Sequence, residues 1–147
     1  MSTRTSAVRA GIAHQGHAFQ KAGDEALIAS EFWRFVEWSD VRGVLVVGSG
    51  NLVHNLHAYG WGRRQIKPFD WAVRFEGRAR ELLLADHHDP LIAYETLGRD
   101  AALSVPTPDH YLPLLYVIAQ QREEDEVSFP VEGFDGGSIS MLSVKIG

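Results

Sequence analysis

The chain has 147 residues, of which 45% are hydrophobic and 22% are charged, and that length is typical of a single domain. Acidic residues outnumber basic ones by 19 to 14, so the formal net charge is −5. This balance argues against nucleic acids and anionic membranes as partners, because both are bound through an excess of Lys and Arg. There is no cysteine, which excludes disulfides, thiolate metal sites and a thiol nucleophile, and which fits a cytoplasmic protein. The longest apolar stretch, residues 111–119, is far shorter than the roughly 20 residues of a membrane-spanning helix.

The first part of the chain differs in composition from the rest. No Asp or Glu precedes Asp24, and Ser, Thr, Arg and Ala are frequent there. A transit peptide shares this composition, but no amphipathic arginine stripe is present, so we interpret residues 1–23 as a tail. Residues 24–38 carry apolar side chains at helical spacing, which predicts a helix.

A buried strand is predicted at residues 44–47, a continuous apolar run with β-branched side chains between Gly43 and Gly48. Such a run is typical of a strand that is covered on both faces. The chain then turns at residues 48–51. A second helix is predicted at residues 70–84, weakened locally by Gly77. Its expected core positions are Trp71, Val73, Phe75, Leu82 and Leu83.

The remaining elements begin at proline-containing signals. Asp89-Pro90 predicts the start of a short helix, and Thr107-Pro108 the start of another over residues 111–121, with a kink at Pro113. Residues 127–131 and 139–146 read as strands. Helices and strands interleave, so the expected class is α/β, with a mixed or mostly parallel open sheet flanked by helices.

The glycine-rich turn is a candidate ligand-binding loop, since ligands bind at the carboxyl ends of strands in open α/β sheets. A dinucleotide loop is one interpretation, because Gly48 and Gly50 match the first glycines of G-x-G-x-x-G. Val53 stands in place of the third glycine, and no Walker lysine follows. A nucleotide-binding module is therefore the weakest of the functional hypotheses.

Two of the seven histidines are candidates for chemistry. His54 follows the turn in an otherwise apolar segment, and either local hydrogen bonds or a functional role explains it there. His57 is three positions on and could share a helix face with it. If Thr107 caps the helix, His110 lies at the third helical position, where the helix dipole favours the neutral imidazole that metals require. The other histidines considered are interpreted as solvated, either in the tail (His14 and His17) or at a helix end (His87 and His88).

Three segments in order resemble the C-terminal half of the class III extradiol ring-cleavage dioxygenases, of the DOPA 4,5-dioxygenase type. They are GSGNLVHNL at residues 48–56, PTPDHYLPLLYV at residues 106–117 and GSISMLSVKIG at residues 137–147, with PFDWA at residues 68–72 between them. The resemblance runs from about Val41 to Gly147. It implies that residues 41–147 are the C-terminal part of an extradiol dioxygenase-like domain, and that residues 1–40 are a divergent N-terminal segment.

The resemblance implies a non-haem metal site, with Fe(II) in catalysis and zinc as an alternative metal. His54 and His110 match the family histidines that line the metal pocket. One of them would ligate the metal while the other acts as acid or base; the assignment stays open, with His54 as the catalytic candidate. Asn51 is a weaker candidate for orienting the substrate. The substrates implied are dioxygen and a catechol such as DOPA, whose ring is opened to a muconic semialdehyde.

The family's further metal-binding histidines lie in N-terminal motifs that this sequence lacks. Iron normally takes at least three protein ligands, so we expect a truncated dioxygenase whose site is completed from elsewhere. The alternative is a catalytically inactive fragment that binds zinc weakly through His54 and His110 or pairs with another chain. An unpaired sheet edge would also be compatible with a homo-oligomer.

Overall fold

The computed structural model describes residues 44–63 and 66–147. The predicted tail and the helix at residues 24–38, together with His14 and His17, lie outside these ranges. The described elements, in chain order, are α3 (Asp70–Leu84), α4 (Asp89–Ile92), the 3₁₀ helix η2 (Tyr94–Leu97), α5 (Arg99–Ser104), α6 (Leu112–Ile118), β1 (Val127–Ser128), β2 (Phe134–Asp135), β3 (Ile139–Ser140) and β4 (Lys145–Ile146).

The long helix α3 is confirmed with the predicted bounds. Its buried side chains recur every three or four positions, as an amphipathic helix requires, and they are Ala72, Phe75, Glu76, Ala79, Leu82 and Leu83. Trp71 is partly buried against this core. The prediction for Val73 was wrong: its side chain is 48% exposed, because it lies outside the buried face of α3 that Ala72, Phe75 and Ala79 form.

Helix α6 begins later than the sequence signals predicted. The residue before it is Tyr111, and no side chain caps its first turn. Pro113 lies within the first two helical positions, where its missing N–H costs nothing, so no kink arises. Thr107 is not the cap, and His110 lies in the turn before the helix rather than at its third position.

The strands are shorter than expected. In the described part of the chain β1 pairs with β4 and β2 with β3, both antiparallel. The protein therefore mixes helices with small antiparallel sheets, and parallel pairing does not occur among the described residues. The strand predicted at residues 44–47 is also corrected. This segment is extended but pairs with no described strand, and Leu45 and Val47 are 84% and 78% exposed.

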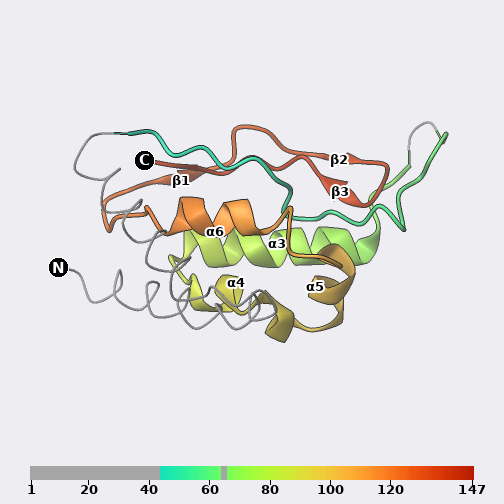
Figure 1. The fold of residues 1–147 in the computed structure, drawn as a ribbon, viewed down its shortest axis with the longest axis horizontal. Coiled ribbons are helices and arrows are strands. Elements are labelled where there is room, and N and C mark those ends of the chain that lie inside the picture. Colours follow the sequence, from blue (N-terminus) through green and yellow to red (C-terminus); the bar gives the residue numbers. More distant parts are fainter. Residues whose placement is uncertain (1–43, 64–65) are drawn as a thin grey trace, which may run out of the picture.

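The elements form layers (Figure 1). The strands and the extended segment that starts at Val44 run along one side of α3 and α6, and α4 and α5 lie on the other side. The core between these layers is apolar; its largest fully buried side chains include Tyr111, Leu83, Leu91 and Ile92. The hydroxyl of Tyr111 donates to the Leu91 carbonyl at 2.8 Å, so this buried polar group is satisfied. No helix in the described ranges is long and apolar enough to cross a membrane.

Candidate active site

The structure brings His54 and His110 into direct contact. Their imidazole rings stack with centroids 3.6 Å apart and planes inclined by only 16°. His54 is half-buried and His110 is exposed, so the pair lies at the boundary between core and solvent. Two histidines from separate sequence motifs therefore meet at one point.

Backbone contacts hold His54 in place. Its N–H donates to the Ser104 carbonyl at the end of α5, at 2.8 Å, and it forms an isolated antiparallel bridge with Ile139 of β3. The next residue, Asn55, is buried and donates its side-chain amide to the Leu103 carbonyl at 2.7 Å. These bonds tie the His54 segment to both α5 and β3.

Asn51 links the glycine turn to the second histidine. Its backbone N–H donates to the His110 carbonyl at 2.8 Å, and its side-chain amide donates to the Ser140 carbonyl at 2.8 Å. Since both of these donors bond to the protein itself, Asn51 acts in this structure as a brace between the three motif segments. Its predicted role in binding substrate stays a prediction.

Gly50 explains why the turn is glycine-rich. A Cβ atom at this position would collide with the backbone carbonyl oxygen of His110. A Cβ atom at Gly48 would lie 2.7 Å from the Pro113 carbonyl oxygen, which is also too close. The glycines therefore permit close packing of the turn against the chain that carries His110, rather than an approach to phosphate.

Glu76 is a residue that the sequence reasoning missed. It lies on the buried face of α3, is 7% exposed, and accepts a short hydrogen bond from the Ser140 hydroxyl. Ser140 in turn donates its backbone N–H to the Val53 carbonyl at 2.9 Å. In the sequence, the only available signal for Glu76 was its place in the helical repeat of apolar side chains. Glu76 thus supports the strand that holds both Asn51 and the segment before His54.

The environment of Glu76 favours its protonated form. Burial raises the pKa of the Glu76 carboxyl, and the hydrogen bond from Ser140 and the charge of Arg80 only partly oppose that effect. The Arg80 guanidinium is 4.0 Å from Glu76 but bonds Glu132 at 2.7 Å. The stronger partner of Arg80 is therefore Glu132, which leaves Glu76 weakly compensated.

The pair also favours a neutral His54. Burial lowers the pKa of His54 first, and the neighbouring charge of His110 lowers it further. An imidazole with a pKa below its usual value is unprotonated at neutral pH. It is then able to accept a proton from a substrate hydroxyl or to ligate a metal.

The remaining described histidines stand apart from this site. His57 is exposed, as is His87, and no contact joins His57 to the stacked pair. The interpretation of His88 was wrong: it is 4% exposed, because it lies before α4 with its ring packed into the protein. Burial lowers the pKa of His88.

The orientation of the two imidazole rings determines whether they fit an iron centre. The lone pair of an imidazole nitrogen lies in the plane of its ring. Two nearly parallel rings whose centroids are 3.6 Å apart do not direct their in-plane lone pairs at a common ion, so His54 and His110 cannot both bind one metal in this arrangement. Among the described residues, no group of three or more His, Cys, Asp or Glu side chains is placed to hold a metal. The described residues alone do not make an iron site.

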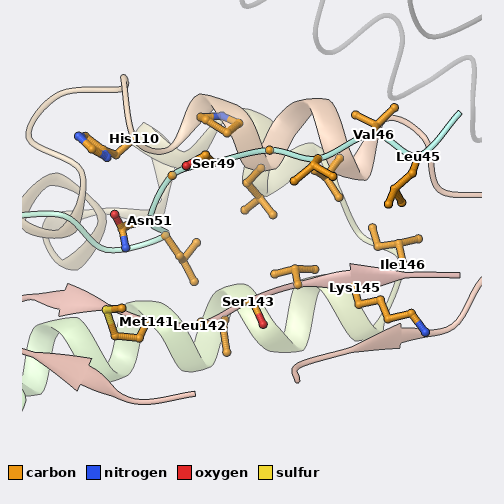
Figure 2. Close-up of a pocket in the computed structure, with 18 residues that line it drawn as sticks. Leu45, Val46, Ser49, Asn51, His110, Met141, Leu142, Ser143, Lys145 and Ile146 are labelled. Atoms are coloured by element: carbon orange, nitrogen blue, oxygen red, sulfur yellow. The ribbon is translucent and has the colours of Figure 1, made fainter. Parts of the chain in front are cut away.

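A groove adjoins the histidine pair (Figure 2). It has a volume of about 560 Å³ and runs between residues 45–52 and residues 141–146, with Pro113, Leu114 and Val117 of α6 along it. His110 and Asn51 lie towards one end, and Ile146 and Lys145 towards the other. His54 is not among the residues that line the groove.

Comparisons with known proteins agree with the resemblance drawn from the motifs. The chain is 41% identical over 110 residues to a protein of Escherichia coli strain K12 named 4,5-DOPA dioxygenase extradiol, a match to 72% of this chain and 40% of the relative. Proteins of the same name from Beta vulgaris and Portulaca grandiflora are each 27% identical to this chain, and the match covers 38% of each of them. No family model matches the chain.

A solved structure shows the same fold. The crystal structure of an uncharacterized protein from Escherichia coli K12 superposes with a TM-score of 0.69 at 39% identity, and the match covers 80% of this chain and 48% of that one. The chain spans about two fifths of the length of the curated relatives it matches. The resemblance to the 4,5-DOPA extradiol dioxygenases is thus confirmed, and this chain is homologous to part of those proteins.

Proposed function

We propose that this chain supplies the His54–His110 part of the active site of a metal-dependent extradiol dioxygenase that acts on a catechol such as DOPA. The observation that carries the proposal is the stacking of these two imidazoles, which come from two motifs shared with that family. The remaining metal ligands come from outside the residues that the structure describes. The open sheet expected of the α/β fold is completed from there as well.

The proposed reaction opens the aromatic ring beside one of the two catechol hydroxyls. Both atoms of dioxygen enter the product, which is a muconic semialdehyde. The catechol must lose its hydroxyl protons, and His54 is suited to accept one because its lowered pKa keeps it neutral. His110, the more exposed ring, is the better candidate for a metal ligand.

The expected cofactor is Fe(II), with zinc as the alternative metal. Imidazole suits either ion, but His110 alone does not suffice, so the proposal requires further ligands from outside the described residues. The absence of cysteine fits a reducing cytoplasmic setting for such an enzyme.

A second candidate function follows from the incomplete metal site. No group of three metal-binding side chains occurs in the described ranges, as expected of an inactive fragment that binds zinc weakly or pairs with another chain. The two candidates differ in whether a complemented chain consumes dioxygen.

The test mixes this chain with the N-terminal part of the E. coli relative, which ends where the match to this chain begins. The mixture is loaded anaerobically with Fe(II), and oxygen uptake and semialdehyde absorbance are followed with DOPA. The proposal predicts uptake by the mixture with one dioxygen consumed per DOPA. A stable complex that consumes none would favour the inactive fragment.

A further inference from the structure

The groove described above has the features of a site where one further β-strand could pair. One wall, residues 45–52, is an extended segment. Among the described residues, no backbone hydrogen bond involves residues 44–50. Unpaired N–H and C=O groups along an extended chain are able to pair with another strand.

The opposite wall is the free edge of the β1–β4 sheet. The N–H groups of Met141, Ser143 and Gly147 all donate towards residues 126–133. Because successive peptide groups of a strand point to alternate sides, the N–H groups of Val144 and Ile146 point the other way, towards the groove. That edge is therefore available to pair with another strand.

The two walls run in opposite directions. In Figure 2 the segment from Leu45 to Asn51 passes from right to left, and the segment from Met141 to Ile146 passes from left to right. A strand inserted between them would be antiparallel to one and parallel to the other. This is the mixed pairing that the α/β pattern predicts and that the described strands lack.

The side chains require an apolar occupant. Leu45, Val47 and Met141 line the groove and are 84%, 78% and 48% exposed, and exposed large apolar side chains that gather in this way are typical of an interaction surface. Lys145 is the one Lys, Arg, Asp or Glu among the residues that line the groove. On the other face of the extended segment, Gly48 and Gly50 pack closely against Pro113 and His110.

We propose that this groove is a strand-docking slot, defined by residues 45–52 and 141–146, which accepts an apolar β-strand from the part of the dioxygenase fold that this chain does not span. The chain covers 40% of the E. coli relative, so a large complementary part exists in that family. Residues 1–23 contain no apolar β-branched run that could serve as the strand. The identity of the occupant rests on the proposed function.

Filling the slot also affects the site. Asn51 and His110 line the groove, and the Asn51 N–H bonds the His110 carbonyl. A docked strand would bury the extended segment that leads into this contact and bring the complementary part of the fold next to the exposed His110 ring. The dioxygenase site is then incomplete without the occupant.

The test mixes the full chain with the N-terminal part of the E. coli relative and measures complex formation and amide hydrogen exchange. We expect a one-to-one complex in which the amides of residues 45–47, Val144 and Ile146 become at least tenfold more protected. A complex that leaves these amides unprotected, or no complex at all, would overturn the proposal. Protection of the same amides in a homodimer of this chain would overturn the assigned occupant.

A matched pair of variants gives a second readout. Val47→Asp places a charge in the slot, whereas Leu84→Asp places one on α3, where the side chain is 63% exposed and does not line the groove. We expect Val47→Asp to weaken the complex at least tenfold and Leu84→Asp less than twofold; equal effects would contradict the slot. A complex with protected amides that consumes no dioxygen would refute the proposed function and leave the slot intact. Oxygen uptake by the chain alone would refute the slot and leave the proposed function intact.

Discussion

His54 and His110 lie face to face, with ring centroids 3.6 Å apart, although they belong to motifs separated by a helix-rich stretch of chain. The contact depends on the glycine turn. The turn lets Asn51 bond the His110 carbonyl and leaves room for that carbonyl beside Gly50. The predictions below test this arrangement and its support.

The stacked contact predicts that His110 affects the pKa of His54. In the metal-free chain, His110→Ala removes a neighbouring charge that lowers the pKa of His54. The pKa of His54 should therefore rise towards 6.5, without reaching it, because burial is the larger cause and remains. NMR titration of the imidazole Cε1–H signals measures this. An unchanged or lower His54 pKa would show that the rings do not interact in solution.

Close packing at Gly50 predicts a destabilised site on substitution. Gly50→Ala puts a methyl group against the His110 carbonyl, and overpacking of this kind costs about 1–3 kcal/mol. The control is Gly77→Ala in α3, where an added methyl meets nothing within 4 Å and should stabilise the helix by about 0.5–1 kcal/mol. Urea denaturation of both variants gives the two free energies. Equal values for the two would refute the account of the turn.

Glu76 predicts a specific pH dependence of stability. Its pKa is raised in the folded protein, so between its ordinary value of 4.5 and the raised value the folded state binds more protons than the unfolded state. The contribution of Glu76 to the free energy of unfolding is complete below its ordinary pKa. This contribution is lost as the pH rises through the raised pKa of the folded state. Glu76→Gln should remove that decline. Denaturation of both proteins across this window measures it, and parallel pH profiles would exclude the proposed burial effect.

The buried hydrogen bond of Tyr111 predicts a large loss of stability when its hydroxyl is removed. Tyr111→Phe removes the hydroxyl that donates to the buried Leu91 carbonyl and leaves that acceptor unpaired, which costs about 1–3 kcal/mol. The comparison is Tyr59→Phe, which removes a solvent-exposed hydrogen bond to Asp135. Water replaces that partner, so the unfolding free energy should change less. Thermal and urea unfolding distinguish the two, and a larger loss for Tyr59→Phe would contradict the role assigned to Tyr111.

The sequence predicts α3 well because its period is strong and many positions contribute to it. It predicts the wrong start for α6, since the Thr107-Pro108 signal competes with the turn that positions His110, and Pro113 is tolerated in the first helical turn instead. The prediction of a strand at residues 44–47 was wrong for a different reason. Apolar β-branched residues indicate that a segment is suited to burial between neighbours, but pairing depends on partners that are absent from the described part of the chain.

The candidate site could be predicted only through its motifs. The resemblance of two motifs to a known family singled out His54 and His110, and the structure places their rings in contact. Glu76 could not be found in this way, because its position in the apolar repeat of α3 does not reveal its role until its partner Ser140 is located. The burial of His88 was missed for the same reason: adjacent histidines do not reveal which of them points inward.

The most direct test of the account compares oxygen uptake by three variants in the Fe(II)-loaded complex of this chain with the N-terminal part of the E. coli relative. His54→Ala and His110→Ala should each lower DOPA-dependent uptake by about 100-fold or more, since loss of a general acid or base costs roughly 10²–10⁴-fold and loss of a ligand releases the metal. His57→Ala, in the same segment but exposed, should keep the activity of the unmodified chain. Uptake that survives in folded His54→Ala and His110→Ala complexes would contradict the assignment of these two residues.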